Sequence, residues 1–106
     1  DRQLKIDGYR IEPVEVEAAL RDEPGVLDAV VVPLGQGPAA RLIAFVAVGD
    51  SPAEGVASTL RKALAARLPA AMRPQRIHVL EHLPLLAANK IDTEALRRID
   101  AGRRVR

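Results

Sequence analysis

The stretch LPLLAANKID places one lysine, Lys90, between a run of small apolar residues and an aspartate. A lysine offers chemistry a positive point charge on a flexible stem. Most lysines in connecting segments are exposed and inert, although functional residues are often found on loops. The residues alone therefore leave two interpretations of Lys90 open, an inert loop residue and a functional cation.

The other candidates for chemistry are a glycine, two histidines and two glutamates. Gly8 either supplies a turn with positive φ or lets another backbone or a ligand approach closely. His78 falls in an expected strand and His82 directly after it, so we expect structural or surface histidines. Glu15 and Glu17 fall on an expected helix that buries its other face, which predicts a solvated helix face. The sequence has no glycine-rich phosphate loop, no Ser-His-Asp set and no clustered carboxylates in a plausible cleft.

The composition excludes several kinds of site. There are no cysteines, which excludes disulfides and thiol nucleophiles, and the two histidines lack the spacing of metal ligands, so we expect no metal site. Tyr9 and Phe45 are the only aromatic residues, which argues against base-stacking platforms for nucleic acid. No apolar run is long enough to cross a bilayer and no signal peptide is visible, so we expect a cytoplasmic location and no membrane partner.

The net charge of +2 is unevenly distributed. Residues 1–28 hold eight of the fourteen acidic residues, and residues 61–106 hold eleven of the sixteen basic ones. The final stretch RRIDAGRRVR reads as a basic tail over residues 97–106, and such tails are usually solvated. Nucleic-acid binding by this tail is the alternative, but it has only electrostatic attraction in its favour.

The first part of the chain predicts a hairpin followed by a helix. Short alternation in LKIDGYRIEP predicts a small two-stranded hairpin with Gly8 at the turn. A helix is expected from Pro13, which suits a first turn, to a stop at Pro24 and Gly25. Two apolar pairs at i and i+4 spacing define the face that this helix should bury: Val14 with Ala18, and Val16 with Leu20.

The middle of the chain predicts a sheet and a second helix. Apolar runs at 27–34 and 41–48 predict two strands, antiparallel because their connection is short, and the first run is typical of a strand buried on both faces. Residues 76–81 predict a third strand. Residues 53–68 predict a helix whose apolar stripe repeats every four residues: Val56, Leu60, Leu64 and Leu68.

These elements add up to one small domain. Asp92 can cap a last short helix over residues 93–99 by accepting backbone N–H bonds. The fold class is therefore α+β: a small, mostly antiparallel three-stranded sheet with packed helices, plus an N-terminal two-stranded hairpin. The 106 residues fit one domain, and because the chain does not begin with Met we read it as part of a longer polypeptide.

Two segments of the chain resemble signatures of the adenylate-forming enzymes, which include acyl-CoA synthetases, amino-acid adenylation domains of non-ribosomal peptide synthetases and firefly luciferase. The opening segment is similar to D-x-Q-(V/I)-K-(I/V)-x-G-x-R-(I/V)-E-x-x-E-(I/V)-E, and residues 83–96 are similar to L-P-x-T-x-x-G-K-(V/I)-D-x-x-x-L. RLPAAMRPQRIHVLEHLPL also resembles the lead-in to the second signature, so the resemblance covers nearly the whole chain. The matching residues are Asp1, Gln3, Lys5, Ile6, Gly8, Arg10, Ile11, Glu12, Glu15, Val16 and Glu17, then Leu83, Pro84, Lys90, Ile91, Asp92 and Leu96.

Three residues of the second segment depart from the family pattern. Leu86 stands where threonine is usual, Ala88 where asparagine is common, and Asn89 where a glycine precedes the lysine. Asparagine tolerates a left-handed backbone, but less freely than glycine does. Lys90 itself remains in register.

The resemblance implies that residues 1–106 are the mobile C-terminal subdomain of such an enzyme, beginning at a hinge at Asp1. In this family a carboxylate attacks the α-phosphate of ATP, giving an acyl- or aminoacyl-adenylate and pyrophosphate. A phosphopantetheine thiol of a carrier protein or of CoA then takes the acyl group as a thioester. ATP and Mg²⁺ would be bound mainly by the large N-terminal domain, so the isolated fragment is expected to be inactive.

The resemblance also implies roles for individual residues. Lys90 would bridge the substrate carboxylate and the phosphate or ribose oxygens during adenylate formation. Gly8 would line the pantetheine tunnel during thioester formation, where a side chain would obstruct the thiol arm. Lys5 and Arg10 would contact the carrier protein or CoA phosphates, or else they form ordinary surface salt bridges.

Within the family, KIDGYRIEPVEVEAAL and NKID favour an amino-acid or aryl-acid adenylation domain that loads a carrier protein. A C-terminal subdomain of an acyl-CoA ligase is the alternative. Outside this class, a non-catalytic α+β binding or docking module remains open. The partners expected from the first interpretation are the N-terminal adenylation subdomain, the carrier protein or CoA, and a carboxylic or amino acid, with no nucleic acid.

Overall fold

The computed structural model describes residues 4–6, 8–35 and 37–104. Three short 3-10 turns connect the main elements: η1 (Gly37–Ala39), η2 (Ala70–Met72) and η3 (Ala87–Asn89). The strands and helices, in chain order, are β1 (Leu4–Ile6), β2 (Tyr9–Ile11), α1 (Pro13–Arg21), β3 (Asp28–Leu34), β4 (Arg41–Ala47), α2 (Val56–Arg67), β5 (Arg76–Leu80) and α3 (Thr93–Arg104).

The sheet has the strand order β3-β4-β5, and the hairpin β1-β2 is separate from it. Strands β3 and β4 pair antiparallel, as their short connection predicts, and β1 and β2 also pair antiparallel around Gly8. Strand β5 pairs parallel to β4, because helix α2 carries the chain back across the sheet before β5 begins. The three-stranded α+β fold is confirmed, with one parallel pair in the sheet.

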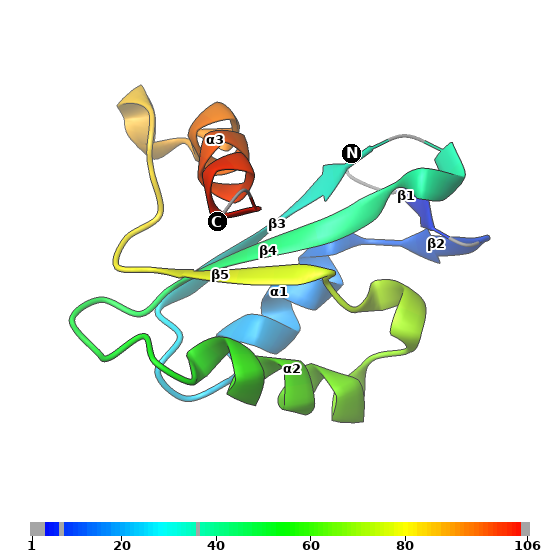
Figure 1. Cartoon of the computed structure of the whole chain (residues 1–106), viewed down its shortest axis with the longest axis horizontal. Helices are drawn as coiled ribbons and strands as arrows, with labels where there is room; N and C mark the ends of the chain where they lie inside the picture. Colours follow the sequence, from blue (N-terminus) through cyan, green and yellow to red (C-terminus); the bar gives the residue numbers. More distant parts are fainter. Residues whose placement is uncertain (1–3, 7, 36, 105–106) are drawn as a thin grey trace.

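The sheet separates two helical layers, with α1 and α2 on one face and α3 on the other (Figure 1). Successive strand residues point to opposite faces, so each face receives its own apolar cluster. Residues Val31, Leu42, Ala44 and Val46 meet Val16 and Leu20 of α1 and Leu60 and Leu64 of α2. Residues Val30, Val32, Ile43 and Phe45 meet Leu83 and Leu96 on the other face. The predicted stripe of α2 and the burial of β3 on both faces are thereby confirmed.

The buried face of α1 differs from the predicted one. Val16, Ala19 and Leu20 are buried, at i, i+3 and i+4, so they form one stripe against the sheet. Val14 is 54% exposed and Ala18 is also exposed, so their predicted burial is wrong. The helix buries one of the two predicted apolar pairs because only one stripe can face the sheet.

Glu17 is also a correction, because it does not lie on a solvated face. Its side chain is only 3% exposed, and its Oε2 accepts the backbone N–H of Val31 at 2.8 Å. Glu15, predicted to be solvated in the same way, is exposed. The glutamate is drawn inward because β3 is an edge strand whose outward backbone groups need partners.

Other side chains complete the protection of this edge. Arg21 donates to the carbonyl oxygen of Ala29 at 2.8 Å, and Oδ1 of Asp28 accepts the N–H of Ala29 at 2.8 Å. Pro33, two residues beyond Val31, has no N–H to offer. The outward N–H groups at positions 29, 31 and 33 are therefore each occupied or missing.

The C-terminal helix is longer than predicted. Residues 97–104, assigned to a basic tail on sequence grounds, continue α3 without interruption. Ile99 packs against the second cluster and Asp100 is buried, so this segment is held against the sheet. No helix in the described part of the chain is long and apolar enough to cross a membrane.

Candidate functional site

The segment around Lys90 is a closed loop. Leu85 and Ile91 form an antiparallel bridge, and the N–H of Leu86 donates to the carbonyl oxygen of Lys90 at 2.6 Å. Outside the bridge, the N–H of Asp92 donates to the carbonyl oxygen of Pro84 at 3.0 Å. Lys90 thus occupies a fixed position beside the base of the loop.

The tip of this loop needs two left-handed residues in succession. Ala88 has φ 64° and ψ 22°, and Asn89 has φ 61°. Asn89, which replaces the usual glycine, adopts the glycine-like backbone conformation that asparagine tolerates. A left-handed alanine costs roughly 1–2 kcal/mol, so some strain is stored at Ala88. The departures from the family pattern therefore leave the loop able to turn.

The side chain of Lys90 is exposed, and within the described residues nothing forms a hydrogen bond or ion pair with its ammonium. Leu85 and Leu86 beside it are 52% and 53% exposed. Among the described residues, a charged end with no local partner next to uncovered apolar side chains is an arrangement suited to another surface.

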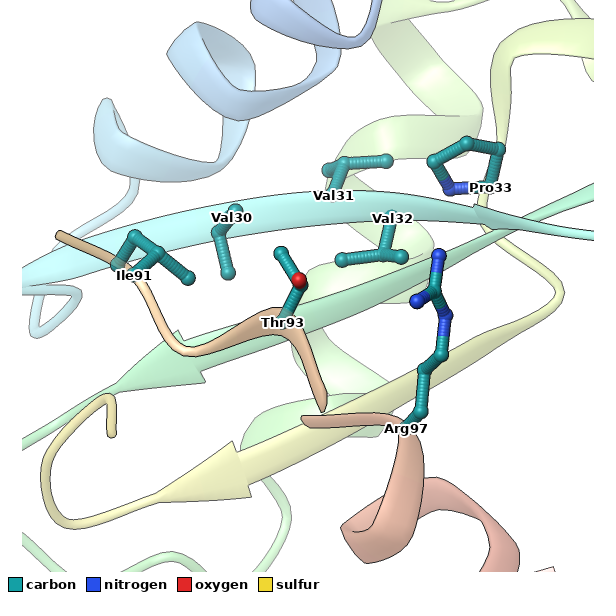
Figure 2. Close-up of a pocket in the computed structure, with 7 residues that line it drawn as sticks. All are labelled: Val30, Val31, Val32, Pro33, Ile91, Thr93 and Arg97. Carbon is teal, nitrogen blue, oxygen red and sulfur yellow. The ribbon is translucent and has the colours of Figure 1, made fainter. Parts of the chain in front are cut away.

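A hollow of about 330 Å³ lies directly after the loop. Figure 2 shows Ile91, Thr93 and Arg97, which follow Lys90 in the chain, facing side chains of the edge strand β3. The hollow is mostly apolar, with the guanidinium of Arg97 as its charged group. Its lining consists of Val30, Val31, Val32, Pro33, Ile91, Thr93 and Arg97.

Helix α3 supports the loop from its C-terminal side. Asp92 caps the helix as predicted, since its Oδ1 accepts the N–H of Ala95 at 3.0 Å. Its carbonyl oxygen accepts the N–H of Leu96 at 3.2 Å, and Leu96 is fully buried. On the other side, Leu83 is buried in the same cluster. The loop is therefore anchored at both ends to the α3 face of the sheet.

A buried ionic cluster ties α3 to β5. Arg76 donates from Nε and Nη2 to the two carboxylate oxygens of Asp100, at 2.8 and 3.0 Å. His78 Nε2 lies 2.6 Å from Oδ1 of Asp100, and because an ionised carboxylate can only accept, the ring nitrogen is the donor. Burial raises the pKa of Asp100, but the hydrogen bonds from Arg76 and His78 outweigh it and hold that pKa below its usual 3.8. The ring of Phe45 packs against His78 at 5.2 Å between centroids.

Only part of this cluster was predicted from the sequence. His78 has the structural role that was expected, and His82 is exposed. The ion pair was missed because its partners lie 22 and 24 residues apart. The available signal was the spacing of Asp100, which lies one turn after Leu96 on the same helix face.

The hairpin holds the other predicted site residues. Gly8 has φ +84°, and a Cβ built there would meet nothing within 4 Å of the described chain. Lys5 and Arg10 are cross-strand partners and both are exposed, with no ion pair to either among the described residues. Two like charges placed opposite each other disfavour the isolated hairpin. The expected hinge, Asp1, lies outside the described residues.

The two candidate segments do not come together. In Figure 1 the hairpin lies at the right, whereas the lysine loop projects at the upper left, above the face that carries α3. The hairpin is held by Ile6 and Ile11 in the cluster beneath the sheet. Across the described ranges, no group of three or more His, Asp or Glu side chains could hold a metal ion.

Comparison with known proteins gives a consistent family. The profile of the family described as AMP-binding enzyme C-terminal domain matches residues 15–90. The isonitrile lipopeptide synthase of Streptomyces coeruleorubidus is 48% identical over 97 residues, covering 91% of this chain and 6% of that protein. The phosphinothricin tripeptide synthetase PhsB of Streptomyces viridochromogenes is 41% identical over 108 residues, covering 100% of this chain and 9% of that protein.

A solved structure agrees with these relatives. The anthranilate CoA ligase AuaEII in complex with anthranoyl-AMP matches with a TM-score of 0.76 and 26% identity, covering 100% of this chain and 20% of that chain. This chain therefore spans less than a tenth of the length of the two synthetases and about a fifth of the ligase chain.

Proposed function

Since the chain belongs to the family of AMP-binding enzyme C-terminal domains, we propose that it is the mobile C-terminal subdomain of an ATP-dependent carboxylate-activating ligase. The parent enzyme forms an acyl- or aminoacyl-adenylate and transfers the acyl group to a phosphopantetheine thiol. Residues 1–106 form this subdomain, and the hinge is at Asp1. The single observation that carries the proposal is the closed loop that holds Lys90 with its ammonium exposed.

Lys90 is the adenylation lysine of this proposal. A carboxylate oxygen attacks the α-phosphorus of ATP, and the bond from that phosphorus to the departing pyrophosphate breaks. The two reactants are both anionic, so an ammonium between them offsets their repulsion and stabilises charge in the transition state. The fixed loop base and the solvent-exposed side chain support this role, because the loop holds the lysine in place and no described residue of the domain neutralises its charge.

The hairpin serves the second half of the reaction. Gly8 leaves open space at the turn, which suits the close passage of a pantetheine arm. Lys5 and Arg10 present two adjacent positive charges that fit the phosphate of that arm or an acidic carrier surface. Surface salt bridges, the other role considered for these two residues, have no support among the described residues.

The two segments act in turn at one active site. They lie far apart on opposite faces of the sheet, so a rotation of the whole domain brings one to the site as it removes the other. ATP and Mg²⁺ are assigned mainly to the N-terminal domain, as the family resemblance implies. The fragment alone then has no useful activity.

A carrier protein is the preferred thiol donor. The two named synthetases, by their names, make a lipopeptide and a tripeptide, and they are 48% and 41% identical to this chain. The anthranilate CoA ligase is 26% identical, so transfer to CoA is the second candidate. With a carrier protein as acceptor, the proposed substrate is an amino acid or an aryl acid. A non-catalytic docking module would make Lys90 dispensable, which the following experiment tests.

The test is ATP–pyrophosphate exchange by the parent polypeptide over a panel of amino acids and carboxylic acids. Lys90→Ala is compared with Lys62→Ala, which removes an exposed lysine of α2. We expect wild type to exchange with one or a few acids. The exchange rate should fall about a hundredfold or more in Lys90→Ala and should stay unchanged in Lys62→Ala. Robust exchange that ignores Lys90 would refute the role of the loop. The absence of exchange with every acid would favour the docking module.

A further inference from the structure

Helix α3 is the element that connects the Lys90 loop to the rest of the domain on its C-terminal side. The helix begins at Thr93, and Asp92 joins loop to helix through its cap and through its hydrogen bond to Leu96. The bridge between Leu85 and Ile91 fixes the shape of the loop. The direction in which the loop points therefore follows the placement of α3.

Few side chains hold α3 against the sheet. Leu96 and Asp100 are 0% and 1% exposed, and they lie one turn apart on the same face. Ile99 is partly buried beside them, whereas Glu94, Arg97 and Arg98 are exposed. The helix thus rests on one apolar anchor and one buried ionic anchor, while exposed Arg103 adds a longer hydrogen bond of 3.4 Å to the carbonyl oxygen of Val79.

The two anchors constrain the helix differently. Apolar packing around Leu96 is non-directional, so it tolerates small rotations and shifts of α3. The contact of Asp100 is directional, because both of its oxygens meet the planar fork of Arg76 and one of them also meets His78. The ionic anchor therefore defines the rotation and the axial position of α3.

We propose that Asp100 is a positioning residue for adenylate formation, which it supports by holding α3, and with it the Lys90 loop, in register with the sheet. The inference rests on the proposed function of Lys90. It adds that a carboxylate in the C-terminal half of α3 controls the first half-reaction without touching substrate. Arg76, and to a lesser extent His78, complete the anchor.

The hairpin provides an internal control for this proposal. Ile6 and Ile11 pack in the cluster on the α1 and α2 face, away from Asp100. Disturbing the Asp100 anchor should therefore impair adenylate formation, which uses Lys90, and spare the thioester step, which uses the segment around Gly8. A loss of overall folding would impair both.

The experiment uses the full parent enzyme and compares Asp100→Asn with wild type. The control is Glu94→Gln, which removes an exposed carboxylate from α3. Adenylation is measured as kcat and KM of pyrophosphate exchange with the acid that wild type activates. Thioester formation is measured in a single turnover from preformed acyl-adenylate. We expect Asp100→Asn to lower kcat of exchange about tenfold or more, since small misplacements of a catalytic group are costly, with thioester transfer within about twofold of wild type.

The double variant Lys90→Ala with Asp100→Asn distinguishes an effect of Asp100 through Lys90 from a general structural effect. If Asp100 acts through Lys90, adding Asp100→Asn to Lys90→Ala causes no further loss of exchange. The proposal would be overturned if the losses of exchange in the two single variants multiplied in the double variant. It would also be overturned if Asp100→Asn slowed both half-reactions equally or left exchange unchanged. Unchanged exchange in Lys90→Ala alone would instead overturn the role of the lysine. If Asp100→Asn does not fold, Arg76→Lys is used instead, because it keeps the positive charge but removes the two-pronged guanidinium contact. It should also slow exchange while sparing thioester transfer.

Discussion

The buried glutamate of α1 leads to a quantitative test. Glu17→Ala removes the acceptor for the N–H of Val31 on the edge strand. A buried donor left without a partner costs about 1–3 kcal/mol, and the one lost buried methylene, Cγ, costs about 0.8 kcal/mol. Together these terms predict a fall of about 3 kcal/mol in the free energy of unfolding. Glu17→Gln keeps the length and an amide oxygen acceptor, so we expect a fall of about 1 kcal/mol.

Urea unfolding of the 106-residue chain, followed by circular dichroism, measures these changes. Glu15→Ala is the matched control, because the same residue type two positions earlier is exposed. It should change the free energy of unfolding by less than about 0.5 kcal/mol. Equal effects of Glu17→Ala and Glu15→Ala would refute the reasoning. A Glu17→Gln variant more stable than wild type would show that desolvation of the carboxylate outweighs its hydrogen bond.

Two further changes test the α3 face of the sheet. Because its hydrogen bonds with Arg76 and His78 hold the pKa of Asp100 below 3.8, the stabilisation from the ionised carboxylate is full above that value and is lost as the pH falls below it. The difference in unfolding free energy between wild type and Asp100→Asn should therefore shrink below about pH 3.8 in acid titrations, and a difference that stays constant would contradict the ionic anchor. In the loop, Ala88→Gly removes the strain of a left-handed alanine, so thermal unfolding should show a gain of about 0.5–1 kcal/mol after the entropy of glycine is subtracted. Asn89→Ala, which adds such strain, should instead lower the stability.

The sequence predicted most of the fold because local patterns dominate it. The β-branched run from Val30 to Val32 predicts a buried strand, and the apolar residues that repeat every four positions from Val56 to Leu68 predict a helix with one buried face. The structure confirms both. The parallel pairing of β5 follows from the helix between β4 and β5, so it depends on the order of the elements and not on a pattern within one of them. The mistaken burial of Val14 arose because two apolar pairs were present and only one could face the sheet.

The candidate site was less accessible to prediction. Lys90 was found through the resemblance of its segment to a family, since its physical setting is that of any loop lysine. Glu17 and Asp100 were missed for a shared reason: each is a polar residue whose burial depends on a partner far away in the sequence. Their helical spacing indicates the inward face, but the partner that stabilises the charge is visible only in three dimensions.

In the longer parent polypeptide proposed for this chain, the occupied edge of β3 has a further consequence. The two synthetases named above are more than ten times as long as the segment they share with this chain. Segments tethered in one polypeptide meet at high effective concentration, so a strand with open N–H groups would be offered many competing strands during synthesis. Glu17, Arg21, Asp28 and Pro33 remove that opportunity. The same few side chains that complete a small sheet thus also keep neighbouring parts of a long protein from misassembling with it.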